Sequence, residues 1–283
     1  MGAEQAEVLG VPNFCWTWDR VLARGGQPTG TEHFEALREA GIGTVISLRV
    51  DGEPSGYSTH AVLDPSSGDA WDAQVTYCVQ DQRSLCDQAG LKFCQIPCPD
   101  LVAVSPWAVA EALAAIDSEL DGGRAVFVHC ILGIGRTGLI TAAWLMSKGL
   151  DANAAAARFL QSFDAWCAAH DVGTDHRNEN FVAFGAAERW WTLHQVANAL
   201  GCPITQSFGL QVPPCPEAAR DWEQAYAACL RSWRERRIAL PVVDAIAAPL
   251  GELGDRKMDG TNGPLPGNAE VLTCSDPDNS SSA

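Results

Sequence analysis

The amino-acid sequence predicts an α/β fold, a mostly parallel central sheet flanked by helices on both faces. Short apolar runs with the length of buried strands alternate with longer segments in which apolar residues recur every three or four positions. A chain of 283 residues is long enough to bury a full core of this kind. The last part of the chain has a different composition, which predicts a helical C-terminal extension followed by a disordered tail.

The N-terminal part of the chain is expected to begin with a strand and a helix. The strand is predicted around Phe14–Trp18. Thr31 is expected to cap the helix, which presents Phe34 and Leu37 on one face and is closed by Gly41.

A buried strand, a loop and a second strand are predicted next. Thr44–Leu48 has the apolar, β-branched character of a buried strand. Residues 51–74 are rich in Gly, Ser, Pro and Asp, which predicts an irregular loop. After a strand over Leu91–Ile96, Ser105 is the expected N-cap of a helix that has Pro106 at its first position.

This helix is expected to end at a pair of glycines and to lead into the central strand. Its buried face is predicted to consist of Val109, Leu113, Ile116 and Leu120, with the stop at Gly122 and Gly123. A short strand over Ala125–Val128 follows, and then a helix from about Gly138 to Ser147.

The C-terminal part is predicted to be helical and then disordered. Helices are expected over Asp151–Phe163, from about Asn178 to Leu200, and over Pro216–Leu240. In the last of these, Trp222, Tyr226, Leu230 and Trp233 recur at three- and four-residue spacing. Such a stripe favours packing on the parent domain over binding of a partner. Residues 251–283 carry too few large apolar groups to form a core, which predicts the disordered tail.

Charge and cysteine usage restrict the partners and the compartment. The formal net charge of −16 argues against binding of nucleic acid or of an anionic membrane surface. The 11 cysteines show neither C-x-x-C pairs nor histidine partners at metal-ligand spacing, so we expect no metal and no cofactor. No secretory signal opens the sequence and no apolar run is long enough to span a membrane, which predicts a reducing compartment, the cytoplasm or the nucleus. The sequence does not predict an oligomeric state.

The most informative stretch is the loop from Cys130 to Arg136, which lies between a predicted strand and a predicted helix. A cysteine nucleophile must be a thiolate, and the backbone N–H groups at a helix N-terminus stabilise such an anion or a bound phosphate. Arg136 adds a permanent charge whose planar fork can hold two phosphoryl oxygens. Gly133, Gly135 and Gly138 allow the backbone to approach the ligand closely.

Two neighbours of this loop are assigned supporting roles. The hydroxyl of Thr137 is expected to donate to the sulfur, which makes Cys130 a better leaving group. His129 is expected to lie beneath the loop and to hold it by hydrogen bonding. The remaining phosphate-binding positions are Ile131, Leu132, Gly133, Ile134 and Gly135.

Cys130 and Arg136 with five residues between them, followed by Thr137-Gly138, resemble the signature of cysteine-dependent protein tyrosine phosphatases. Further segments resemble the atypical dual-specificity branch of that superfamily, in this order: Pro12–Trp16, Gly26–Pro28, Gly41–Arg49 and Ile96–Asp100. The resemblance implies a protein tyrosine phosphatase-like fold and covers roughly residues 11–190. On this basis we divide the chain into a catalytic domain over 11–200, a helical extension over 201–250 and a tail over 251–283.

Phosphoryl transfer to water also needs a carboxylic acid that protonates the leaving oxygen. Asp100 is the predicted acid, because it lies between a strand and a capped helix and because the resemblance places the acid on this loop. Asp81 and Asp87 lie further upstream without that context. The alternative is that Asp100 is an ordinary solvated turn residue.

The resemblance also implies a glutamine near the start of the final helix, where Asn178 stands in this sequence. Asn178 could orient the hydrolytic water, or it could serve only as a helix cap, and the sequence does not decide between these two roles.

Two other interpretations of the signature loop remain. Residues 133–138 also fit the G-x-G-x-x-G pattern of dinucleotide-binding folds, but no second strand with an acidic residue follows at the required spacing. Cys130 could also be an ordinary buried thiol. The combination with histidine, arginine, threonine and three glycines favours the phosphatase interpretation.

The resemblance implies a phosphatase that acts on phosphotyrosine and on phosphoserine or phosphothreonine in proteins, through a phosphocysteine intermediate. The variable positions of the loop carry no lysine, which favours singly phosphorylated substrates. The alternatives are a phosphatase of phosphoinositides or of RNA 5′-phosphates, and a catalytically silent module that binds a phosphorylated partner.

Overall fold

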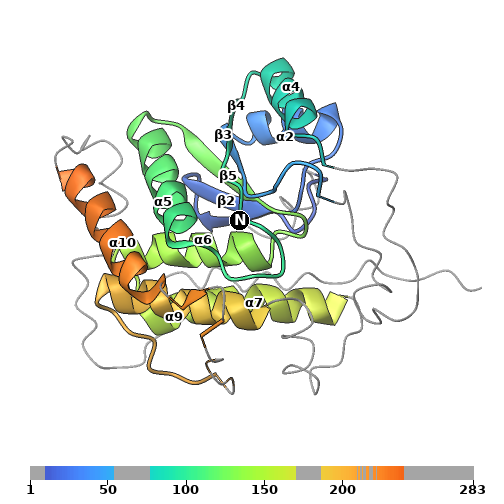
Figure 1. Cartoon of the computed structure of the whole chain (residues 1–283). Coiled ribbons are helices and arrows are strands. Elements are labelled where there is room, and N and C mark those ends of the chain that lie inside the picture. Colours follow the sequence, from blue (N-terminus) through green and yellow to red (C-terminus); the bar gives the residue numbers. More distant parts are fainter. Residues whose placement is uncertain are drawn as a thin grey trace, which may run out of the picture.

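The computed structural model describes residues 10–53, 77–169 and 186–238, the last range without residues 209, 211, 213, 214, 217, 218 and 221. A sheet of five strands in the order β1-β2-β5-β3-β4 lies at the centre (Figure 1). Its strands are β1 (Cys15–Trp18), β2 (Leu22–Gly25), β3 (Ile42–Ser47), β4 (Lys92–Gln95) and β5 (Ala125–His129). Only β1, at one edge, pairs in the antiparallel sense, so the predicted mostly parallel sheet is confirmed.

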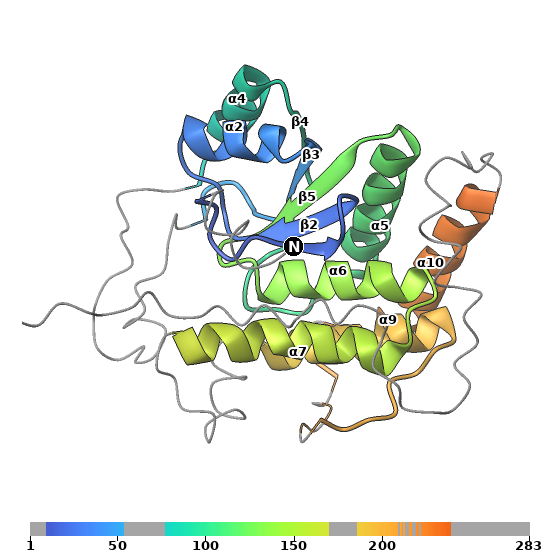
Figure 2. The ribbon, with the colours of Figure 1, turned by 180° about the vertical axis from the view of Figure 1, so that it is seen from behind.

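Helices cover both faces of the sheet, as Figures 1 and 2 show from opposite sides. One face carries α2 (Thr31–Glu39) and α4 (Val79–Ala89). The other carries α5 (Pro106–Asp121) and α6 (Gly135–Ser147), with α7 (Ala152–Ala169), α9 (Ala186–Leu200) and α10 (Trp222–Ile238) packed behind them. In the described parts of the chain, no helix combines the length and the apolar character needed to cross a bilayer.

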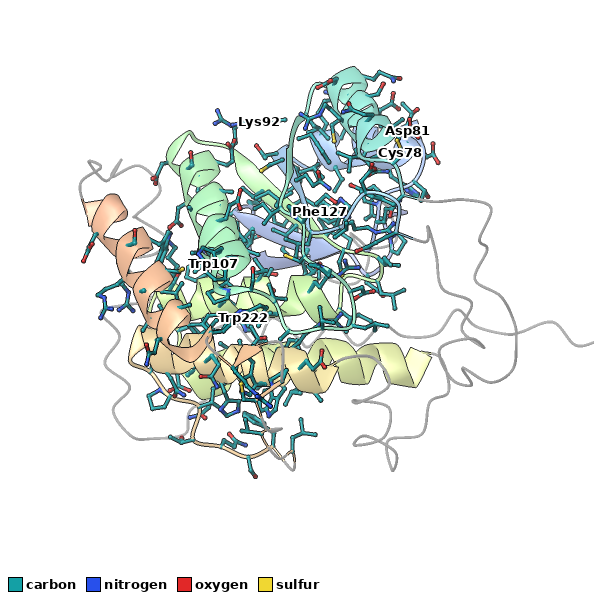
Figure 3. The ribbon with its side chains drawn as sticks, viewed as in Figure 1. Cys78, Asp81, Lys92, Trp107, Phe127 and Trp222 are labelled. Atoms are coloured by element: carbon teal, nitrogen blue, oxygen red, sulfur yellow. The ribbon has the colours of Figure 1, made fainter. Side chains whose placement is uncertain are left out.

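The alternation of side chains along the strands explains why helices are needed on both faces. In β5, Val126 and Val128 point into the core beneath α5 and α6, whereas Phe127 points into the second core beneath α2 and α4. All three side chains are fully buried, and Figure 3 shows Phe127 at the centre of the sheet. Burial of a side chain of this size contributes about 1.5–3 kcal/mol, so neither face can be left open to water.

The helix starts agree only in part with the predictions. The Ser105 hydroxyl accepts from the Ala108 amide at 3.2 Å, with Pro106 at the first helical position, as predicted. The prediction that Thr31 caps α2 was wrong, because Gly30 at φ 80° is the N-cap and Thr31 is already helical. Glycine tolerates this left-handed backbone without a Cβ penalty. The helix α6 begins at Gly135, three residues before the predicted start, and α10 begins at Trp222.

The C-terminal helix α10 is packed on the rest of the domain. Tyr226, Leu230 and Trp233 are at most 4% exposed and belong to the same core as α5, α6 and the central strand. The predicted packing role of this stripe is confirmed. The domain boundary at residue 200 stays a prediction. The tail over 251–283 and most of the predicted loop over 51–74 lie outside the described residues.

The topology brings chemically important residues to one edge of the sheet. Four strands run parallel, so their carboxyl ends meet at the same edge. Gln27 follows β2, Arg49 follows β3, Asp100 follows β4 and Cys130 follows β5. Ligands of open α/β sheets bind at this carboxyl edge, which makes it the place to look for a site.

Candidate active site

Cys130 follows the central strand directly and lies at the N-terminal end of α6. Its side chain is a free thiol, 4% exposed. The strand is held from both sides there, since His129 pairs with Gly25 of β2 and Ser47 of β3, and the Leu48 amide donates to the His129 carbonyl at 2.9 Å. The position of the sulfur is therefore fixed by the centre of the sheet and not by a surface loop.

The signature loop, residues 130–136, is held from outside by its carbonyl oxygens. The Gln27 amide donates to the Ile131 carbonyl at 2.8 Å, and the Asn13 side-chain amide donates to the Leu132 carbonyl at 2.7 Å. In a trans peptide the next N–H points the opposite way, so the amides of residues 132 and 133 face the inside of the loop. No described backbone acceptor is bonded to the amides of residues 131–134. The loop thus presents unpaired donors to an anion.

Gly133 is required by the close contact between this loop and the end of β2. Its φ is +77°, and a Cβ at this position would overlap the backbone of Gly25. Any larger residue would push the loop away from the sheet.

Arg136 lies in the first turn of α6 and is 1% exposed. Its Nη1 donates to Oε1 of Glu53 at 2.7 Å and to the carbonyl of Cys98 at 2.8 Å. Its Nε and Nη2 donate no hydrogen bond to the described part of the chain, although Nη2 lies 3.3 Å from Oδ2 of Asp100. One edge of the guanidinium is therefore anchored, and the other is available for two oxygens of a phosphoryl group.

The surroundings of Cys130 favour its thiolate. Burial alone would raise the pKa of the thiol, but the charge of Arg136 and hydrogen bonds from the hydroxyl and backbone amide of Thr137 lower the pKa below its ordinary value. The buried Thr137 hydroxyl has no nitrogen or oxygen partner among the described residues. Burial lowers the pKa of the Arg136 guanidinium, but this effect is outweighed by nearby negative charges. The pKa is raised overall by Cys130, Asp100 and Glu53.

His129 is fully buried beneath the loop, and its ring stacks on Phe127 at a centroid distance of 5.9 Å. Burial lowers the pKa of His129 to about 3, so the ring is neutral at physiological pH. Its Nδ1 lies 3.1 Å from the carbonyl oxygen of Cys130. In the neutral ring this nitrogen carries the proton and donates to that carbonyl.

Asp100 lies over the signature loop between two arginines. Its Oδ2 faces Arg136, and its Oδ1 accepts from Nη2 of Arg189 on α9. The backbone amide of Leu101 also donates to Oδ1 at 3.0 Å, and Leu101 has a φ of +60°. The structure thus brings Asp100, Cys130 and Arg136 together, as the sequence predicted for a shared site, and adds Arg189.

Glu53, a partly buried residue that the sequence did not predict as part of the site, supports Arg136 from behind. Glu53 accepts from Arg136 through Oε1 and from Nε of Arg49 at 3.1 Å through Oε2. Arg49 is fully buried, lies 4.4 Å over the ring of Tyr77 and donates to the side chain of Gln27. Burial lowers the pKa of Arg49, and its ion pair with Glu53 acts against that shift. The guanidinium of Arg136 is therefore part of a network that reaches β2 and β3.

A comparison with protein families identifies this arrangement. A family model described as "Polymorphic toxin system, DSP-PTPase phosphatase" matches residues 23–150. Residues 23–150 are similar to DSP-PTPase phosphatases. The match includes the acid candidate and the whole signature loop, and it ends before α9 and α10.

Solved structures resemble this chain at low identity. A DUF442 protein of Shewanella putrefaciens CN-32 is 20% identical over 68% of this chain and 94% of its own, with a TM-score of 0.45. TpbA of P. aeruginosa is 17% identical over 67% of this chain and 91% of its own, with a TM-score of 0.42. Tk-PTP in its active form is 20% identical over 62% of this chain and 97% of its own, with a TM-score of 0.37.

The two upstream aspartates that lack the context of an acid loop lie away from this cluster. Asp81 and Asp87 are exposed on α4, on the opposite face of the sheet from α6, and Figure 3 shows Asp81 at the outer end of the molecule. Asn178 lies outside the described residues, so its water-positioning role stays a prediction. Within the described ranges, no group of three or more metal-ligating side chains could hold a metal ion.

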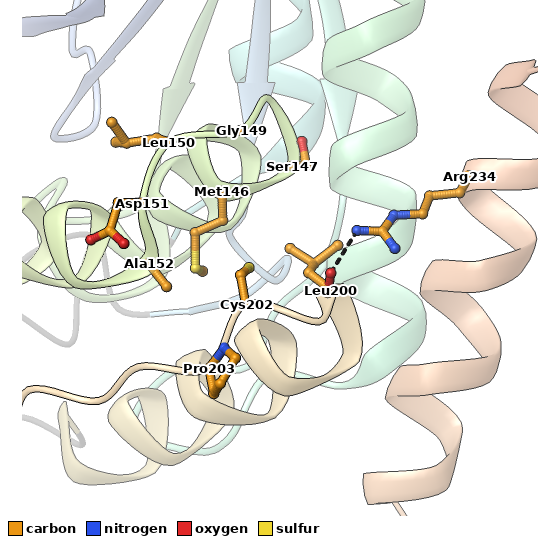
Figure 4. A pocket seen from close by; sticks show the side chains of 10 residues that line it. All are labelled: Met146, Ser147, Gly149, Leu150, Asp151, Ala152, Leu200, Cys202, Pro203 and Arg234. Atoms are coloured by element: carbon orange, nitrogen blue, oxygen red, sulfur yellow. Dashed lines mark hydrogen bonds between the residues drawn. The ribbon is translucent and has the colours of Figure 1, made fainter. Parts of the chain in front are cut away.

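A separate cleft lies at the far end of α6, about 20 Å along the helix from the signature loop. Its volume is about 390 Å³, and it is closed on one side by Arg234, which donates to the Leu200 carbonyl at 2.9 Å (Figure 4). None of the residues that the sequence assigned to the phosphatase site lines this cleft.

Proposed function

We propose that this phosphatase domain hydrolyses phosphotyrosine and phosphoserine or phosphothreonine in proteins through a phosphocysteine intermediate. The observation that carries the proposal is the pairing of a thiol of lowered pKa with a guanidinium whose Nε and Nη2 donate no hydrogen bond to the described part of the chain. A phosphoryl group that accepts from this edge has its phosphorus close to the sulfur, which is the arrangement that nucleophilic attack requires.

In the first step, the Cys130 thiolate attacks phosphorus. A sulfur–phosphorus bond forms, the bond from phosphorus to the ester oxygen breaks, and Asp100 gives its proton to the departing oxygen. Arg136 and the inward-facing amides of the loop hold the three remaining oxygens as charge develops on them.

Asp100 must be protonated for this step, although two arginines stabilise its carboxylate in the substrate-free protein. A bound phosphoryl dianion takes the Nη2 of Arg136 that now faces Asp100. This removes one stabilising cation and brings negative charge near the carboxyl group, and both changes favour the protonated acid.

In the second step, water attacks the phosphocysteine. The carboxylate of Asp100 takes a proton from the water, the sulfur–phosphorus bond breaks, and inorganic phosphate leaves. The Thr137 hydroxyl stabilises the departing thiolate, because it lowers the pKa of Cys130 and meets no competing oxygen or nitrogen acceptor among the residues that the structure describes. The neutral ring of His129 keeps the loop in place throughout.

The side chains of the signature loop support a preference for singly phosphorylated substrates. Between Cys130 and Arg136 the chain carries only isoleucine, leucine and glycine, so no further cation in the loop would bind a second phosphate. The net charge of −16 disfavours RNA 5′-phosphates, because a polyanion is repelled at long range.

The test is release of phosphate from an aryl phosphate, from phosphopeptides of each type, from phosphoinositides and from a 5′-triphosphorylated RNA. Wild type is compared with Cys130→Ser and Asp100→Ala. We expect activity on the aryl phosphate and the phosphopeptides, no activity for Cys130→Ser, and the largest loss in Asp100→Ala for substrates with poor leaving groups. Binding of phosphopeptides without turnover by the wild type would instead establish the silent module, and a preference for phosphoinositides or RNA would refute the protein substrate.

A further inference from the structure

The segment that carries Asp100 is bonded at two points to helices outside the matched phosphatase domain. We call residues 97–105, between β4 and α5, the acid loop. The first point is Asp100, which accepts from Arg189 of α9. The second point is Val104, four residues further along the acid loop. There the Val104 amide donates to the Thr192 hydroxyl of α9 at 3.3 Å, and the Val104 carbonyl accepts from the Tyr226 hydroxyl of α10.

These contacts are built into the core. Arg189 is 4% exposed, Thr192 and Tyr226 are fully buried, and α9 packs against both α6 and α10. Burial raises the pKa of Tyr226 beyond its ordinary range, so its hydroxyl keeps the proton that it donates. The acid loop is therefore anchored by buried side chains and not by solvent-exposed contacts.

Arg189 also touches the signature loop. A Cβ at Gly135 would lie 2.9 Å from Cζ of Arg189, so the absence of a side chain at Gly135 is what makes room for the guanidinium. The one arginine therefore contacts the acid loop through Asp100 and the signature loop through Gly135.

Substrate binding makes the contact between Arg189 and Asp100 more important. Asp100 faces Arg136 and Arg189, and the charged sulfur of Cys130 also acts on it. When a phosphoryl group engages Arg136, Asp100 loses that contact, and Arg189 is a partner that remains to hold the carboxyl group over the reacting phosphorus.

From these contacts we propose that α9 and α10 form a clamp that holds the acid loop over the signature loop, and that Arg189 is the positioning residue through which the clamp orients Asp100. The inference rests on the proposed function, in which Asp100 is the proton donor. It gives the part of the chain after residue 150 a role in proton transfer rather than in packing alone.

The test uses the full chain with Arg189→Gln, Arg189→Lys and Tyr226→Phe, and compares para-nitrophenyl phosphate, which has a good leaving group, with phenyl phosphate, which has a poor one. A positioned acid contributes about 10²- to 10⁴-fold. We expect kcat/KM for phenyl phosphate, which reports the step that releases the leaving group, to fall by about tenfold to a hundredfold in Arg189→Gln, against about threefold or less for para-nitrophenyl phosphate. Arg189→Lys should lose less activity on phenyl phosphate than Arg189→Gln does. Tyr226→Phe should also lower activity on phenyl phosphate more than on para-nitrophenyl phosphate, but by a smaller factor.

The pH profile gives a second readout that a purely structural role would not move. Arg189 stabilises the carboxylate, so its removal shifts the basic limb of kcat/KM for phenyl phosphate to higher pH. Arg231→Gln, which removes an exposed charge on α10, is the matched control and leaves both readouts unchanged. In an Asp100→Asn background, Arg189→Gln should have no further effect.

Equal losses on both substrates, an unmoved basic limb, or additive effects in the Asp100→Asn background would overturn the clamp. Inhibition by inorganic phosphate and circular dichroism show whether each variant keeps its fold and its signature loop. If Arg189→Gln does not fold, Arg189→Lys and Tyr226→Phe decide the question. Failure of the clamp is distinct from failure of the proposed function, because only the latter leaves Cys130→Ser as active as the wild type.

Discussion

Replacement of Arg136 by lysine tests whether the shape of the guanidinium, and not only its charge, is needed. The structure fixes the plane of the group, because Nη1 is held by Glu53 at 2.7 Å and by the Cys98 carbonyl at 2.8 Å. That leaves Nε and Nη2 side by side for two phosphoryl oxygens. An ammonium group has the charge but cannot form this pair of parallel bonds while it also satisfies Glu53.

The expected loss follows from the number of bonds. A hydrogen bond to a charged group contributes about 1.5–3 kcal/mol, and the substitution removes or displaces two of them. A loss of about 3–6 kcal/mol of transition-state stabilisation corresponds to about a 10²- to 10⁴-fold fall in kcat/KM. Initial rates on para-nitrophenyl phosphate measure this, with Arg38→Lys as a control, since Arg38 is 53% exposed and pairs with Glu39 only at 3.9 Å. If Arg136→Lys keeps more than about a tenth of the wild-type kcat/KM, the guanidinium does not bind phosphate in the way described.

Three further predictions concern the residues around this pair. Glu53→Gln breaks a largely buried ion pair and leaves the buried Arg136 without its carboxylate, which is expected to lower the free energy of unfolding by about 3 kcal/mol in urea titrations; an unchanged midpoint would contradict the anchoring role. Thr137→Ala should raise the pKa of Cys130 and move the pH profile of iodoacetamide alkylation to higher pH, whereas Thr137→Ser should not; coincident profiles for Thr137→Ala and the wild type would rule out the hydroxyl contact. His129 has its folded-state pKa lowered from 6.5 to about 3, so its contribution to stability is complete above pH 6.5 and is lost as the pH falls toward 3. The free energy of unfolding should drop by about 1.4 kcal/mol for each pH unit in that window, and a His129→Asn variant that shows the same slope would refute this assignment.

The sequence predicted those parts of the fold in which local pattern and tertiary environment agree. The strand over residues 125–128 is short and apolar, and the helix that follows Ser105 has a capping residue, a proline and a regular apolar face. The strand β2 was missed because its four residues include an arginine and a glycine and are too few for a periodic signal. The helix α4 was missed because most of its residues are polar, and its burial is explained by contacts with α2 and β4.

The residues of the candidate site differ in the same way in how far the sequence could predict them. Cys130 and Arg136 could be predicted because their chemistry depends on a fixed spacing within one loop. Arg189 and Glu53 could not, since they reach the site from elements far away in sequence and no local motif marks them. The partly buried Glu53 could have been suspected only from its place a few residues after a strand at the carboxyl edge of the sheet. Arg189 lies in a helix rich in alanine and aromatic residues, where the pattern indicates packing alone.

The most direct test of the account is to trap the covalent intermediate. The Asp100→Ala variant, which is slowed in hydrolysis, is mixed with para-nitrophenyl phosphate, quenched in acid and digested for mass spectrometry. We predict one phosphoryl group on the peptide that contains Cys130, attached to sulfur, and none in the same digest of Cys130→Ser. Turnover without phosphorylation of Cys130, or phosphate bound to a different residue, would contradict the central claim that this thiolate attacks phosphorus.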